Sequence, residues 1–359
     1  MIKIFELYLI KLFLRKITYI SVIFFILIFI LNLFEEISFF KSSNVNVFYP
    51  ILIGLLNVPS TLLEIFPFIF LIATQFFFLE IINKDELEIL KVNGLSNLKI
   101  LKTLILTSLI LGVLLATLFY NLSSKLKFVY TDIKNTFSND NKYLAVVKES
   151  GLWIKDEIDD KILIITSDNI LSNKLIQVSI YELDQNFNLS KIIQSDEVDI
   201  SNYEWRISNP ITFQDNQNKK LDDILLMTTH FNLDKINSMF NNLSTLGIGQ
   251  LLKLKKDYKS LKYSTTEIDV HLHKIYSLPL FVTIITILTS IIMFNNKKNK
   301  SMIFHLILGV LMSVIIYYLY YLFNLLGENG KMPIIISIYL PFITLFLLAL
   351  IGLVNLNEK

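Results

Sequence analysis

The chain has 359 residues, of which 53% are hydrophobic and only 18% are charged, and it contains no cysteine. Such a composition is too apolar for an ordinary soluble domain, and the lack of cysteine excludes disulfides and thiolate metal sites. The formal net charge of +2 is spread over scattered residues and is too small for a nucleic-acid-binding surface. We therefore expect a membrane protein with no nucleic-acid partner.

Long apolar runs locate the membrane segments. A spanning helix needs about 20 mostly apolar residues. The second apolar run is interrupted by Pro50, Pro59 and Pro67, and proline breaks the helical hydrogen-bond ladder. We predict one crossing there, over 62–82, preceded by a short helix or re-entrant piece. With that choice the chain has six predicted transmembrane helices, at 17–34, 62–82, 103–124, 275–296, 301–327 and 332–357.

Lysine and arginine in short loops indicate the cytoplasmic side of a membrane protein. Three short segments of this chain carry such clusters: the amino terminus, 83–102 and 295–301. A six-helix arrangement with both termini in the cytoplasm places all three on one side. The basic residues concerned are Lys3, Lys11, Arg15, Lys16, Lys84, Lys91, Lys99, Lys102, Lys297, Lys298 and Lys300.

The long segment 125–274 lies between the third and fourth predicted helices and falls on the outer side. Its centre has the alternating pattern of half-buried strands, as in Ile176, Val178 and Ile180. Strands are predicted at 151–154, 161–166, 175–183, 191–200, 203–207 and 211–213, which favours a β-sandwich or jelly roll. An amphipathic helix capped by Ser244 or Thr245 then returns the chain to the membrane surface.

Motifs for catalysis are absent from the sequence. There is no phosphate-binding loop, metal-binding His-Glu-x-x-His helix or Gly-x-Ser-x-Gly elbow, so any ATP used is bound by another subunit. His271 and His273 would share a face on a strand, but they diverge by about 200° on a helix. We interpret them, like His305, as interfacial polar residues. Glu64 and Glu80 are ionisable residues in a predicted membrane segment and keep a secondary transporter open as an alternative.

The segment 83–96 predicts a short helix between two spanning helices on the cytoplasmic side. It carries charges of both signs and ends at Gly94, which suits a left-handed C-cap. Its dimensions are those of a helix that inserts into a groove of a partner protein. A solvated connecting loop would carry the same pattern, and the residues alone do not decide between the two.

This segment resembles the coupling-helix signature of the LptF/LptG lipopolysaccharide-export permease family. Val58-Pro59-Ser60 and Glu64-Ile65-Phe66-Pro67 precede it, and Asp85-Glu86-Leu87 and Gly94-Leu95-Ser96 fit the family pattern. The similarity extends to Leu278-Pro279-Leu280, Met332-Pro333 and Leu340-Pro341, and therefore covers essentially the whole chain. The segment 151–156, Gly-Leu-Trp-Ile-Lys-Asp, is most similar to the LptG branch.

The resemblance implies a membrane α-helical bundle of six transmembrane helices in a bacterial inner membrane, with an inserted periplasmic β-jelly-roll domain. The expected domains are 1–124 with a cytoplasmic coupling helix at 83–94, the periplasmic domain and connecting helix at 125–274, and 275–359. It further implies a non-enzymatic permease subunit of an ATP-driven exporter. The expected partners are an LptF-like permease, an LptB-like ATPase dimer, LptC/LptA-like jelly-roll proteins and lipopolysaccharide, and no cofactor is expected. A permease of another ABC-type lipid or lipoprotein exporter is the alternative nearest to this reading.

Site residues follow from the same resemblance. Glu86, Glu88 and Gly94 would couple the permease to its ATPase. The first and fifth helices would form a lipid gate, for which Phe24, Ile28 and Leu31 and also Ile315, Leu319 and Phe323 recur at helical spacing. Family members often place lysine near the outer end of the first helix, where this chain has Asn32, Glu35 and Glu36. The candidate cations for the lipid headgroup are therefore Lys41, Lys125, Lys127 and Lys134.

Overall fold

The computed structural model describes residues 3–41, 46, 48–137, 152–158, 161–171, 173–214, 217–220, 224–233, 235–236, 242–261, 263–294 and 302–357. The chain forms two compact units, which we call the helical unit (1–127 with 265–359) and the β unit (128–264). The predicted turn lysines Lys297, Lys298 and Lys300 and the first residue of the first predicted strand, Gly151, lie outside the described residues, as does the side chain of His305.

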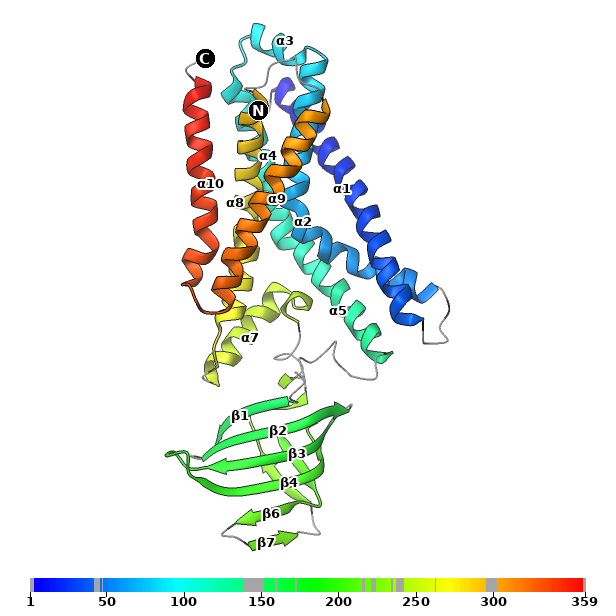
Figure 1. Ribbon diagram of the computed structural model, residues 1–359, viewed down its shortest axis with the longest axis vertical. Coiled ribbons are helices and arrows are strands. Elements are labelled where there is room, and N and C mark those ends of the chain that lie inside the picture. Colours follow the sequence, from blue (N-terminus) through cyan, green and yellow to red (C-terminus); the bar gives the residue numbers. More distant parts are fainter. Residues whose placement is uncertain are drawn as a thin grey trace. The chain divides into compact units, whose positions relative to one another are not determined.

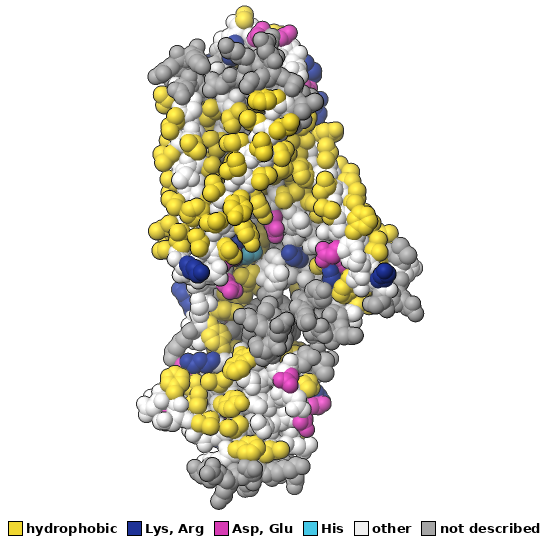
Figure 2. Space-filling model, in the orientation of Figure 1, with side chains coloured by type: hydrophobic (Ala, Val, Ile, Leu, Met, Phe, Trp, Pro, Cys, Tyr) yellow, Lys and Arg dark blue, Asp and Glu magenta, His cyan; other side chains and the backbone are white. Residues whose placement is uncertain are grey.

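Six helices among the described residues are long and apolar enough to cross a membrane. On the face that Figure 2 shows, hydrophobic side chains cover much of the surface over these helices. The predicted number of membrane helices is thus confirmed. The elements are α1 (Ile4–Phe40), α2 (Phe48–Asn83), α4 (Asn97–Leu114) continued by a π-helical segment (Leu115–Phe119) and α5 (Tyr120–Thr136), α8 (Thr266–Phe294), α9 (Met302–Glu328) and α10 (Ile334–Asn357), with the short helix α3 (Glu86–Val92) between α2 and α4 (Figure 1).

The predicted break in the second apolar run is wrong. Helix α2 runs without interruption from Phe48 to Asn83 and contains Pro59 and Pro67 within it. A proline removes only one backbone hydrogen bond, and membrane helices tolerate this loss because no water competes for the remaining bonds and neighbouring helices support the backbone. The run therefore supplies one long helix, with no separate re-entrant piece.

Edge-to-face phenyl rings hold α1 against α2. The ring of Phe13 lies 6.3 Å from that of Phe70 and 5.8 Å from that of Phe77, and all three side chains are fully buried. This geometry is the favourable one for aromatic pairs. Leu9 and Ile69 complete the contact with buried aliphatic side chains. The amino-terminal half of α1 is consequently packed firmly against α2.

The β unit contains one antiparallel sheet. Strand β4 pairs with β5 through Glu197–Asp199 and with β6 through Ile192–Gln194, so the sheet divides and curls into a half-barrel (Figure 1). The predicted inserted β domain is thus present between the third and fourth membrane helices. The strands are β1 (Leu152–Ile158), β2 (Lys161–Leu171), β3 (Lys174–Leu183), β4 (Leu189–Asp199), β5 (Glu204–Ser208), β6 (Ile211–Gln214), β7 (Gln217–Lys220) and β8 (Leu225–Thr228), in the order β1-β2-β3-β4-β5-β8 with β7 paired to β6.

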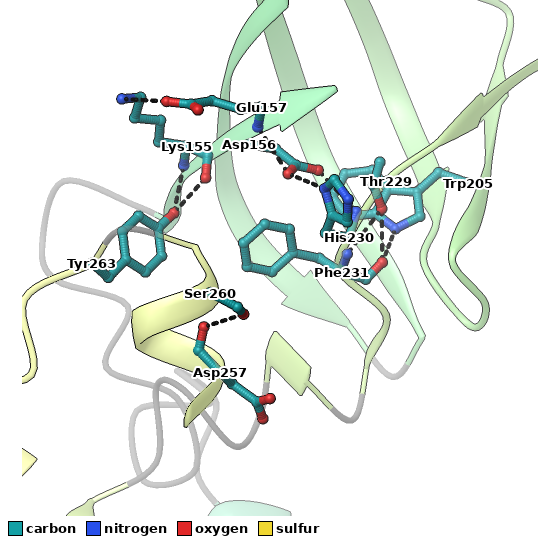
Figure 3. Close-up of polar contacts among 10 residues, drawn as sticks. All are labelled: Lys155, Asp156, Glu157, Trp205, Thr229, His230, Phe231, Asp257, Ser260 and Tyr263. Carbon is teal, nitrogen blue, oxygen red and sulfur yellow. Dashed lines mark hydrogen bonds and ion pairs between the residues drawn. The ribbon is translucent and has the colours of Figure 1, made fainter. Parts of the chain in front are cut away.

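A buried carboxylate organises the interior of this half-barrel (Figure 3). Asp156 is inward-facing on β1, and its two oxygens accept hydrogen bonds from the backbone N–H groups of His230 and Glu157, each at 2.9 Å. In addition, the Nδ1 atom of His230 lies 2.8 Å from Oδ1 of the same carboxylate. Beside it, the fully buried Trp205 donates its indole N–H to the carbonyl of Phe231 at 2.8 Å. These bonds fix the segment after β8 onto the sheet.

A tyrosine covers the outer edge of β1 (Figure 3). The hydroxyl of Tyr263 accepts from the backbone N–H of Lys155 at 2.8 Å and donates to its carbonyl at 2.7 Å. Burial raises the pKa of Tyr263, so the phenol stays protonated and able to donate. The hydroxyl takes the place that a neighbouring strand would occupy, which protects this edge from unwanted pairing.

The amphipathic helix after the sheet is α7 (Ile248–Ser260), and its predicted cap is wrong. Asn242 accepts the N–H of Ser244 and holds a short 3-10 turn over Leu243–Thr245, so the helix begins only after Gly247. The side chain of Gln250 accepts the N–H of Gly247 at 2.9 Å. A single predicted serine or threonine therefore could not serve as the cap.

Close packing between α4 and α8 gives a testable stability prediction. A Cβ atom at Gly112 would lie 2.6 Å from the Cα atom of Pro279 and 2.8 Å from a methyl carbon of Val282. We expect Gly112→Ala to lower the free energy of unfolding by about 1–3 kcal/mol, the usual cost of overpacking. The matched control is Gly249→Ala on α7, where a Cβ atom meets nothing within 4 Å. Thermal unfolding in detergent should separate the two, and equal melting temperatures would contradict the close approach.

Candidate functional site

The short helix α3 is fixed at its carboxyl end by the predicted left-handed glycine. Gly94 has a φ of +83°. The N–H of Leu95 donates to the carbonyl of Leu90 at 3.1 Å, and the N–H of Gly94 donates to that of Lys91 at 2.9 Å. These two bonds form a Schellman cap, which satisfies carbonyls that the helix end would leave open. The helix is therefore well defined despite its seven residues.

The surface of α3 carries apolar side chains that the other described residues leave exposed. None of its residues is buried, and Ile89 and Val92 are 57% and 88% exposed. Glu88 is exposed in the first turn, whereas Glu86 is half-buried. The hydroxyl of Tyr8 on α1 donates to Glu86 Oε2 at 2.6 Å. A rigid helix with an apolar tip and acidic first turn can dock into a complementary groove.

The carboxylate of Glu80, near the end of α2, forms ion pairs with three basic side chains. Arg15 lies at 2.8 Å and Lys84 at 2.7 Å, and Lys16 forms a third ion pair with the same carboxylate. Two of these cations come from α1. The carboxylate thus joins the amino-terminal part of α1 to α2, and it is engaged in a structural cluster that does not extend into the apolar middle of the helix.

A cavity of about 280 Å³ opens between α1, α2, α8 and α9 in the helical unit. Its lining is almost wholly apolar and includes Phe24 and Phe68, whose rings pack edge to face at 5.7 Å. Glu64 and Tyr317 add polar groups to the lining. The space can accommodate an apolar chain with a polar group at one end.

The predicted gate residues do not share one environment. Phe24 lines the cavity, but Ile28 is 5% exposed and belongs to the helical core, while Leu31 is 60% exposed. On α9, Ile315 and Leu319 are exposed, and Phe323 is half-buried. Of the predicted set, Phe24 alone lies on the wall of the cavity. Its neighbours on that wall from α9 are Ser313, Val314, Ile316 and Tyr317.

The candidate headgroup cations also differ. Lys41 and Lys125 are exposed, and Lys127 is half-buried and attracted electrostatically by Glu64. Lys134 belongs to the β unit, where it is buried and donates to the hydroxyl of Tyr130 at 2.9 Å. Lys127 is consequently the cation with a link to the cavity, through Glu64.

The two histidines at the start of α8 contact different tyrosines. His271 Nε2 lies 2.9 Å from the hydroxyl of Tyr120, and His273 Nδ1 lies 3.2 Å from that of Tyr339. In the part of the chain that the structure describes, no three His, Cys, Asp or Glu side chains are grouped as a metal site would require. Both rings therefore serve contacts between helices.

Sequence reasoning missed the residues that tie α1 to α3 and α2. Tyr8 lies 78 positions from Glu86, and Arg15 lies 65 positions from Glu80. The only available signal was the count of basic residues at the amino terminus, which indicated topology but gave no partner.

The model of the family described as lipopolysaccharide export system permease LptF/LptG matches residues 7–355, and one model serves both branches. No curated protein matches the chain.

Proposed function

The chain belongs to the LptF/LptG family of lipopolysaccharide export permeases, and we propose that it is the LptG-like subunit of an ATP-driven exporter in a bacterial inner membrane. It is a multi-pass membrane protein and a transport permease, not an enzyme. In the proposed cycle it extracts lipopolysaccharide from the membrane and passes it to a periplasmic bridge. The family match across all six membrane helices carries the permease assignment, and the resemblance of 151–156 supports the LptG-like branch.

We assign ATP hydrolysis to an LptB-like dimer that docks on α3. The support is physical: the helix is capped, exposed and apolar at Ile89 and Val92, and it bears the acidic side chains of Glu86 and Glu88. An LptF-like permease would complete the membrane bundle. The β unit would lie in the periplasm and meet LptC/LptA-like jelly-roll proteins.

The lipid path we propose runs past the cavity beside α1 and α9. Acyl chains are compatible with its apolar lining, whereas headgroup phosphates need cations. Lys127, near Glu64, and the exposed Lys41 and Lys125 remain the proposed headgroup contacts. Lys134 is less suited, because it is buried against Tyr130. Glu80 gives no support to a secondary transporter, since its carboxylate is engaged in three ion pairs.

The topology can be tested directly, because the chain has no native cysteine. With both termini in the cytoplasm, a cysteine at the exposed position Asn202 should react with a membrane-impermeant maleimide from the periplasm. A cysteine at Val92 should react only after the inner membrane is opened. Labelling of the Asn202 variant solely from the cytoplasmic side would overturn the arrangement.

The lipid path predicts ATP-dependent contact with lipopolysaccharide. A photo-crosslinking residue at Phe24, on the cavity wall, should capture lipopolysaccharide in a way that changes when ATP is added to the complex. One at Leu319 on α9 should do the same. The control is Phe346, which is comparably exposed on α10, and should capture far less. Equal capture at all three positions would remove the case for a gate there.

Charge reversal on α3 tests ATPase docking. Glu86→Lys removes the acceptor of the Tyr8 hydrogen bond and places a third cation close to Lys84 and Lys91. We expect normal membrane insertion but at least a ten-fold loss of ATP-driven transport, on the order of what a reversed charge pair costs at an interface. Glu204→Lys, an exposed position on β5, is the matched control. Full transport and subunit recovery with Glu86→Lys would show that α3 is not the docking helix.

A further inference from the structure

We propose that Tyr8 is a positioning residue that fixes the ATPase-docking helix α3 to the gate helix α1, so that displacement of α3 moves the wall of the lipid cavity. The inference rests on the proposed function of α3 and α1 and extends it to a residue outside the sequence motifs. Tyr8 would contact neither lipid nor ATPase. It would act through Glu86.

The first observation is the contact itself. The Tyr8 hydroxyl donates to Glu86 Oε2 at 2.6 Å, and the acceptor is a carboxylate in the first turn of α3. Hydrogen bonds to an ionised acceptor are shorter and roughly twice as strong as neutral ones. The bond joins a membrane helix to the short helix that precedes α4, across 78 positions of sequence. It therefore couples the orientation of α3 to that of α1.

The second observation is that α1 is held at a second point on the same side. Arg15 and Lys16 bind Glu80, and Lys84 binds it from the turn that leads into α3. Tyr8 and Arg15 are seven residues apart, about two helical turns or 10 Å along the axis, and so lie on one face. Two anchors at that separation restrain both the position and the rotation of α1 relative to α2 and α3.

The third observation is that this half of α1 is tightly packed and can act as a lever. Leu9 and Phe13 are fully buried, and the ring of Phe13 packs against Phe70 and Phe77 of α2. Sixteen residues beyond Tyr8, about 24 Å along the same helix, Phe24 lies on the cavity wall. Leu31, farther on, is exposed. A movement applied at Tyr8 therefore reaches the cavity through one continuous helix.

The geometry distinguishes Tyr8 from the ion pairs of Glu80. Those pairs hold α1 to α2 whether or not α3 moves, since Glu80 itself lies on α2. The Tyr8 bond ends on α3, the segment to which the ATPase would apply force. Loss of the hydroxyl should consequently leave assembly intact and reduce the transport obtained for each ATP.

The experiment compares Tyr8→Phe with Tyr19→Phe, an exposed tyrosine on the same helix. Each chain is purified with its co-purifying ATPase and reconstituted in nanodiscs with lipopolysaccharide, and carries a photo-crosslinker at Phe24. ATP hydrolysis and ATP-dependent capture of lipopolysaccharide are measured together. We expect Tyr8→Phe to keep the hydrolysis rate and lower capture per ATP about five-fold, which corresponds to the ~1 kcal/mol of a typical hydrogen bond. Tyr19→Phe should match the unmodified chain.

An unchanged ratio of lipopolysaccharide capture to ATP hydrolysis in Tyr8→Phe overturns the proposal. An equal fall of hydrolysis and capture also overturns it, because it marks a merely structural role.

Failure of the proposed function would look different. If the unmodified chain captured no lipopolysaccharide in response to ATP, the permease assignment itself would be wrong. If it did so and Tyr8→Phe behaved identically, only the positioning role of Tyr8 would be lost.

Discussion

A backbone that crosses hydrocarbon must satisfy its polar groups within its own helix, since no water is present to replace a missing partner. The helical unit follows this constraint beyond its main chain. Thr74, Thr107 and Thr286 return their hydroxyls to carbonyls one turn earlier on their own helices. Hydroxyl groups that would be costly to bury without a partner are thereby hydrogen-bonded. Charges gather at the helix ends, as in the cluster around Glu80.

The same constraint explains which parts of the fold were predictable from sequence. Six spans follow from hydrophobic length, and Gly94 follows from the need for a left-handed cap, because both depend on local chemistry. The continuity of α2 through Pro59 and Pro67 does not, since it depends on neighbouring helices that support the interrupted ladder. The sequence prediction did not include the four-residue strand β8 or β7, whose four residues are all polar and therefore show no alternation of apolar and polar side chains. The Tyr8–Glu86 contact was invisible because no local pattern encodes a partner 78 residues away.

The β unit is subject to a different constraint, because the unpaired backbone groups at a strand edge can pair with another chain. Asp156 turns inward and accepts the N–H groups of Glu157 and His230. Tyr263 supplies the edge of β1 with a donor and an acceptor in a single hydroxyl. His230 and Tyr263, which make these contacts with β1, both lie far from it in sequence, so strand patterns predicted the sheet but could not predict its closure.

In the proposed cycle, coupling between ATP hydrolysis and lipid movement needs a stiff path from α3 to the lipid cavity. Helix α1 supplies such a path because it packs firmly on α2, through the rings of Phe13, Phe70 and Phe77 and the cations on Glu80. The contact continues farther along α1, where Ile28 and Phe40 are buried and Asn32 donates to the carbonyl of Gly54 on α2. Because α1 is continuous from Ile4 to Phe40, no hinge is required within it, and in the proposed mechanism the movement would depend on how firmly its amino-terminal end is joined to α3.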